Sequence, residues 1–120
     1  MYKLVRSVYI LLLLLASFSL VAQTSNLKFQ RLTIKEGLSQ SSANTIIQDN
    51  FGLIWIGTQE GLNMFDGYDI SYFKHQIKQN KTLSNSYVLK LFEDKNNLLW
   101  VATRNGGLNY KKPLSNSFNR

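Results

Sequence analysis

Apolar and polar residues are distributed in two very different ways along this chain. Residues 8–21 form one apolar run that only two serines interrupt; two cations precede it, and Ala22 ends it before a polar stretch. A positive start, a short apolar core and a small residue at the boundary are typical of a secretory signal peptide. The run is shorter than a membrane-spanning segment, which needs about 20 apolar residues. We therefore predict a signal peptide over residues 1–22, cleavage near Ala22, and a periplasmic or otherwise exported mature chain.

In the rest of the chain the apolar pattern repeats. Residues 38–58 recur without a gap as residues 83–103, at an offset of 45, and Gly61-Leu62-Asn63 returns as Gly107-Leu108-Asn109 after one inserted residue. A period of about 40–50 residues built from short strands is typical of a β-propeller blade. We therefore predict an all-β fold, a partial β-propeller of about two blades with four antiparallel strands each. The predicted segments are a lead-in strand and linker over residues 23–37, a first repeat over residues 38–82 and an incomplete second repeat over residues 83–120.

Four short strands fit one repeat. Residues 53–58 are apolar on both faces, which favours a strand buried between neighbouring sheets. Asp66-Gly67 is a strong signal for a hairpin turn before the fourth strand. The predicted strands of the first repeat cover residues 42–48, 53–58, 61–65 and 69–74.

Matching positions of the two repeats predict the core. Trp55 and Trp100 occupy the same position in apolar strands, so both are expected to pack between blades. Gly57 and Ala102 are the small residues of these strands, as expected where backbones approach closely. The predicted repeat core consists of Trp55, Trp100, Gly57, Ala102, Leu62 and Leu108.

The repeated segment resembles the two-component regulator propeller repeat. That repeat has an acidic turn, a Leu-Trp-Ile-Gly-Thr-like strand, then Gly-Leu-Asn and an aromatic-Asp pair, and residues 49–67 match it nearly throughout. The second copy departs in three places. Asn97 replaces the turn glycine, Ala102 replaces the strand glycine, and Lys111-Lys112-Pro113 stands where the first copy has Phe65-Asp66-Gly67.

The resemblance covers residues 28–110 and implies the N-terminal sensor region of a hybrid two-component histidine kinase. Such a region lies in the periplasm, perceives an extracellular ligand that is commonly derived from polysaccharide, and passes the signal to the kinase. Only the start of such a protein is expected in this chain, which would then act in signalling without catalysis of its own. The implied partners are a poly- or oligosaccharide ligand, and further propeller blades or other chains at open blade faces, because a closed propeller uses about four to eight blades.

Aromatic side chains outside the core are the candidates for ligand contact, because aromatic faces stack well on sugar rings. Tyr68, Tyr72 and Tyr87 lie nearer the turns than the tryptophans do, and we predict them as ligand contacts. A structural role is the plainer interpretation of the same residues, since aromatic side chains are enriched in strands.

Candidate catalytic groups are few. His75 is the one histidine, and the chain lacks the length and glycine-rich phosphate contacts of a kinase, so we predict a solvated strand end rather than a phosphoacceptor. The aspartates fall at turns, where they bond their own backbone, and none has the spacing of a calcium loop. With no cysteine there is neither a disulfide nor a thiolate metal site. We therefore predict no catalytic residue, no metal and no cofactor.

The net positive charge of the chain does not alter the predicted function. The net charge is +7, and +5 once Lys3 and Arg6 are removed with the signal peptide. The cations are scattered rather than striped, which argues against nucleic acid as a partner. Contact with a membrane is expected only through the uncleaved signal segment. Two alternatives stay open: an exported propeller enzyme resembling a polysaccharide lyase, and a structural interaction module that recruits another chain by strand addition.

Overall fold

The computed structural model describes residues 1–16 and 27–120. The chain divides into two compact units, residues 1–30 and residues 31–120. In the first unit, helix α1 (Tyr2–Ala16) is rich in leucine, a good helix former. The predicted cleavage position near Ala22 lies outside the described residues. Across the described ranges, no helix combines the length and the apolar content that crossing a membrane requires.

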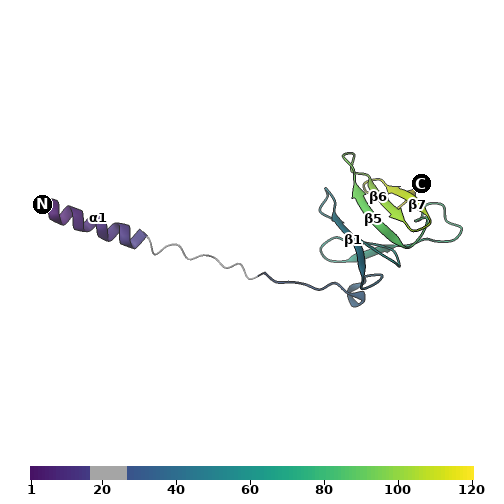
Figure 1. Ribbon diagram of the computed structural model, residues 1–120, viewed down its shortest axis with the longest axis horizontal. Helices are drawn as coiled ribbons and strands as arrows, with labels where there is room; N and C mark the ends of the chain where they lie inside the picture. Colours follow the sequence, from purple (N-terminus) through teal and green to yellow (C-terminus); the bar gives the residue numbers. More distant parts are fainter. Residues whose placement is uncertain (17–26) are drawn as a thin grey trace. The chain divides into compact units, whose positions relative to one another are not determined.

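The second unit contains two four-stranded antiparallel sheets in which strands adjacent in sequence are also adjacent in space (Figure 1). The all-β prediction of two blades with four antiparallel strands each is confirmed, and each predicted strand of the first repeat contains the observed one. The first sheet consists of β1 (Ala43–Gln48), β2 (Ile54–Thr58), β3 (Leu62–Phe65) and β4 (Ile70–Phe73). The second sheet consists of β5 (Val88–Glu93), β6 (Leu99–Thr103), β7 (Gly107–Lys111) and β8 (Phe118–Asn119).

Turn residues explain where the strands end. Asp66-Gly67 forms the predicted turn between β3 and β4, where Asp66 donates its backbone N–H to the Asp69 oxygen at 3.3 Å. In the β1–β2 turn Gly52 has a φ of 84°, and at the matching place in the β5–β6 turn Asn97 has a φ of 60°. Asparagine tolerates this left-handed backbone better than most residues. The second repeat therefore keeps the turn without the glycine.

The residues before the first sheet form a short 3-10 helix and no strand. This helix, η2 (Ile34–Glu36), begins after Thr33, whose hydroxyl accepts the Lys35 N–H at 3.1 Å. The Glu36 carboxylate in turn accepts the Thr33 N–H at 2.6 Å. The lead-in strand predicted within residues 23–37 is not formed in residues 27–37. A strand needs a neighbouring strand for its backbone hydrogen bonds, and neither sheet pairs with these residues.

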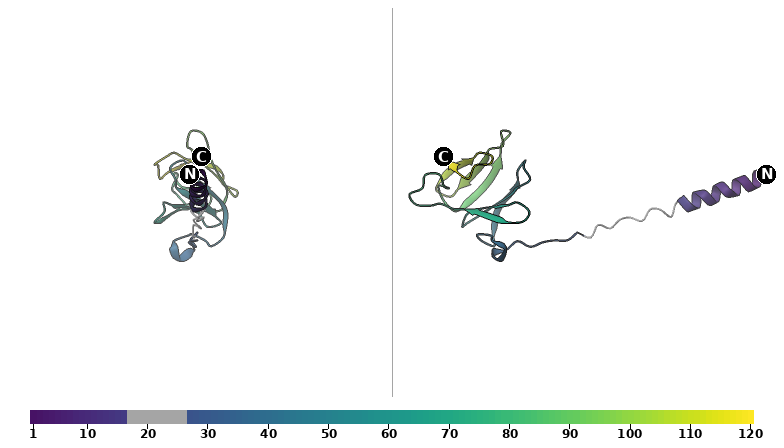
Figure 2. Two further views of the ribbon diagram at one scale, coloured as in Figure 1. Left: turned by 90° about the vertical axis from the view of Figure 1, so that its left-hand side faces the viewer. Right: turned by 180° about the vertical axis from the view of Figure 1, so that it is seen from behind.

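The core lies between the two sheets, where β1 and β5 are neighbours (Figure 1). Figure 2 shows the same unit from the side and from behind. Trp55 and Leu62 of the first sheet are buried in one cluster with Leu99, Val101 and Phe118 of the second. Burial of these side chains between the sheets is the main apolar contribution that holds the unit together.

Candidate interaction and ligand site

The acidic turn of each repeat holds a tryptophan. Asp49 Oδ1 accepts two backbone N–H groups of its own turn at 3.0 and 2.9 Å, and its Oδ2 accepts the Trp55 indole N–H at 2.7 Å. Asp94 makes the same three contacts, with Trp100 at 2.9 Å. The indole hydrogen bond is the leading reason that the pKa of Asp94 is lowered. The bonding of turn aspartates to their own backbone was predicted, and their indole contacts were missed.

A second repeated network joins a serine, a threonine and an asparagine. Asn63 Oδ1 accepts the Ser39 N–H at 2.8 Å, and the hydroxyls of Ser39 and Thr58 lie 2.8 Å apart. Asn63 also donates to Ser39 Oγ at 2.9 Å and to a carbonyl of β2 at 3.1 Å. The second repeat builds the same network from Ser84, Thr103 and Asn109.

Both networks satisfy buried polar groups and therefore have a structural role. Sequence reasoning did not assign a role to the serine, threonine and asparagine. Their identity in the two repeats could have indicated this role. The matching pairs are Ser39 and Ser84, Thr58 and Thr103, and Asn63 and Asn109.

Equivalent faces of the two sheets have different surroundings. The covered face of the first sheet packs against the second sheet and consists of Ile47, Trp55, Gly57, Leu62 and Met64. The equivalent open face of the second sheet consists of Phe92, Trp100, Ala102, Leu108 and Tyr110. A hollow of about 380 Å³ on the open face is lined by four of these residues together with Lys90 and Leu91.

Matching residues of the predicted core differ in burial between the covered face and the open face. Leu62 is completely buried, whereas its counterpart Leu108 is 53% exposed. Trp55 is buried, while Trp100 and Ala102 are half-buried. Among the described residues Leu108 is therefore not buried, because no second sheet lies over the open face, and its place in the repeat core remains a prediction.

Gly57 lies where the two sheets approach each other closely. A Cβ added there would lie 2.5 Å from Val88 Cγ1 on β5 and 2.7 Å from Thr45 Cγ2 on β1. Both distances are below any normal contact, so even one methyl group would force the Val88 and Thr45 side chains, or the strands that carry them, to shift.

At the turn end of the sheets, a cavity of about 260 Å³ lies between them. Its lining includes Asp49, Trp55, Glu93 and Lys111. The Lys111 ammonium lies 5.1 Å from the centre of the Trp55 ring. Burial lowers the pKa of Lys111, and the negative charge of Asp49 offsets part of this effect.

Comparison with known proteins identifies the repeat. Residues 37–60 and 82–105, one stretch from each repeat, match the two component regulator propeller family. These two stretches are repeats of that family. The networks around Asp49 and Asn63 are thus blade architecture, and the two sheets are two propeller blades.

Two relatives extend the comparison. The chain is 41% identical over 82 residues to "Histidine kinase P4" of Formosa agariphila, a match that covers 66% of this chain and 6% of the relative. It is also similar to the crystal structure of the extracellular domain of a hybrid two component system from B. thetaiotaomicron. That match has a TM-score of 0.67 and 31% identity, and covers 75% of this chain and 13% of the solved one. The chain therefore resembles the sensor region of a hybrid two-component histidine kinase and spans a small part of both relatives.

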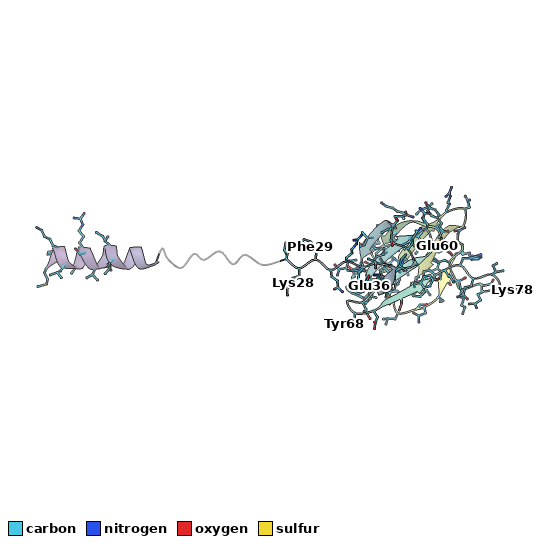
Figure 3. The ribbon with its side chains drawn as sticks, turned by 90° about the horizontal axis from the view of Figure 1, so that it is seen from below. Lys28, Phe29, Glu36, Glu60, Tyr68 and Lys78 are labelled. Carbon is cyan, nitrogen blue, oxygen red and sulfur yellow. The ribbon has the colours of Figure 1, made fainter. Side chains whose placement is uncertain are left out.

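The blades do not bring the three predicted ligand tyrosines into one site. Tyr68 is 92% exposed in the β3–β4 turn and points away from the sheets (Figure 3). Tyr87 precedes β5 at the opposite end of the blades, where the Arg104 guanidinium lies 5.1 Å from its ring centre. Tyr72 is on β4 and lines a separate hollow of about 340 Å³. Three separate positions, rather than one binding site, follow from this arrangement.

His75 lies in the connection between the blades. Its Nδ1 is 2.7 Å from the Leu83 carbonyl oxygen, and its backbone N–H donates to Ser86 Oγ at 3.1 Å. The residue is half-buried, so it ties the connection to the start of the second blade. In the described part of the chain, no three His, Cys, Asp or Glu side chains gather as metal ligands.

Proposed function

We propose that this chain is part of the exported sensor region of a hybrid two-component histidine kinase, and that it takes part in signalling without catalysis. The family match and the relative named as a histidine kinase support this role. The structural relative is an extracellular domain, which supports export. Export would proceed through the apolar segment at residues 1–22, with cleavage near Ala22.

The observation that carries the proposal is the open face of the second blade. Its residues occupy the same positions as those of the covered face in the first blade. On the open face, however, Phe92 is 62% exposed and Leu108 is 53% exposed. Propeller blades bury such faces against a neighbouring blade. We infer that the open face receives a further propeller blade, which would extend the two blades into a larger sensor.

Ligand contact is expected at the rims of the blades, because loops on a rigid scaffold usually carry binding residues. Of the three tyrosines, Tyr72 has the most suitable surroundings. The hollow that it lines also contains two lysines, two glutamines and a threonine, whose donors match the hydroxyl groups of a poly- or oligosaccharide. The assignment of Tyr68, Tyr72 and Tyr87 as ligand contacts remains a prediction.

The docking role is tested by sedimentation of the secreted chain at increasing concentration. An apolar face left open should cause association, so the double variant Phe92→Ser with Leu108→Ser should stay monomeric where the unmodified chain associates. Ile77→Ser is the matched control, because Ile77 is 82% exposed and lies outside the open face. Association that persists in the double variant would contradict the docking role.

The open face equally suits a structural interaction module that binds another chain. Thermal unfolding with a panel of oligosaccharides separates this function from sensing. A sensor should be stabilised by one of them, and Tyr72→Ala should remove the effect. If no oligosaccharide stabilises the chain, the interaction module is the better interpretation.

A further inference from the structure

The cavity between the blades holds a buried cation that belongs to one repeat only. Lys111 occupies the position of Phe65 in the first blade, so it is not part of the repeated framework. Its side chain is only 7% exposed. Its Nζ donates a long hydrogen bond of 3.4 Å to the Lys112 carbonyl oxygen. A buried ammonium normally has a close anionic partner, because loss of water is costly for the charge.

The two nearby carboxylates are already engaged. Asp49 accepts its own turn and the Trp55 indole, as described above. Both oxygens of Glu93 face the Asn50 N–H, at 3.3 and 3.0 Å. The Lys111 ammonium carries three donors and makes one long hydrogen bond, so it keeps the capacity to bind an anion, and the exposed Lys112 lies beside it.

The walls suit an apolar group attached to the anion. Trp55, Leu53 and Met64 line the cavity from the first blade. Leu114 lines it from the second, 93% exposed, with a φ of 58° that leucine rarely adopts. Unfavourable backbone of this kind is concentrated at ligand-binding and switch regions.

We propose that the cavity between the two blades binds a small monocarboxylate whose charge pairs with Lys111 and whose apolar part or ring lies against Trp55 and Leu114. Asp49 and Glu93 repel any anion, so a single negative charge, which the Lys111 ammonium offsets, fits better than the higher charge of a phosphate. The cavity volume of about 260 Å³ is sufficient for one such group rather than for a polymer segment. The proposal adds a ligand class to the sensor role and is independent of blade docking on the open face.

The two tryptophans provide the test. Each indole N–H donates to a turn aspartate, but Trp55 lines the cavity and Trp100 lies on the open face. Benzoate is titrated into the ¹⁵N-labelled full chain, and the two indole resonances are assigned with Trp100→Phe. We expect a saturable shift of the Trp55 resonance and none of Trp100. Neutral benzamide, which has the same shape, should cause no shift.

Lys111→Met should weaken benzoate binding about tenfold or more, the usual effect of removing a charged hydrogen-bond partner. Lys111→Arg keeps the charge and should retain binding. Lys95 is an exposed lysine outside the cavity, so the control variant Lys95→Met should bind benzoate as the unmodified chain does. If Lys111→Met loses its native spectrum, the comparison of benzoate with benzamide on the unmodified chain decides, because binding that ignores the cation would shift the Trp55 resonance equally with both compounds. Equal shifts with benzamide, equal shifts of both indoles, or undiminished binding by a folded Lys111→Met would each overturn the proposal. Any of these results would leave the sedimentation test of the open face unaffected.

Discussion

The first and second blades share one framework but differ in what surrounds it. In both, an aspartate holds the tryptophan indole and a Ser-Thr-Asn network connects the strands. In the first blade the face that carries this tryptophan is covered by the second blade. In the second blade the equivalent face is open. The comparison shows that the repeat motif builds a blade, whereas burial of the blade depends on its neighbour.

The largest expected difference between the blades concerns the paired leucines. Leu62→Ala should reduce the free energy of unfolding by about 2–5 kcal/mol, because Leu62 is completely buried. Leu108→Ala should cost about 1 kcal/mol, since half of the side chain already contacts water. Urea unfolding of the two variants measures both values. Equal losses would mean that the two faces are not different in solution.

The next effect concerns the paired small residues. Gly57→Ala places a methyl group against Val88 and Thr45, and it should destabilise the unit by about 1–3 kcal/mol. Ala102→Val adds more volume on the open face and should change stability by only about 0.5 kcal/mol or less. The same unfolding experiment compares them at low protein concentration. A larger loss for Ala102→Val would show that the open face is already filled.

The smallest effect is a pH dependence of the aspartate–tryptophan contact. The hydrogen bond from Trp100 lowers the pKa of Asp94 in the folded chain. The stability that this contact contributes is fully present when the pH is above the ordinary aspartate pKa of about 4. It is lost as the pH falls through the lower pKa that Asp94 has in the folded chain. The urea midpoint of the unmodified chain should therefore fall more steeply below pH 4 than that of Asp94→Asn. Parallel pH curves would show that this contact does not contribute to stability.

The sequence predicted the blades well because their determinants are local. Turn residues and apolar strands lie within each repeat, so the strand ranges of the first blade could be predicted from the apolar pattern and the turn residues. The burial of each leucine could not be predicted in this way. Leu62 and Leu108 have the same local sequence pattern, and they differ only in whether a second sheet covers them. The predicted strand within residues 23–37 depended on a partner strand that the described residues do not supply.

The candidate site was less predictable for the same reason. Lys111 appeared only as a departure from the repeat, and its position against Trp55 depends on how two blades pack. The contacts of Asn63 with Ser39 join residues 24 positions apart, which spacing alone does not reveal. The ligand tyrosines were chosen because they lie near turns, and those turns lie at different ends of the blades.

The most direct test of the open face is acrylamide quenching of two single-tryptophan variants, Trp55→Phe and Trp100→Phe, at low and high protein concentration. In dilute solution Trp100 should be quenched much faster than Trp55. As the chains associate, quenching of Trp100 should slow toward the rate of Trp55, which itself should stay constant. If Trp100 remains as accessible in the associated chains as in the dilute ones, the open face is not where a blade docks.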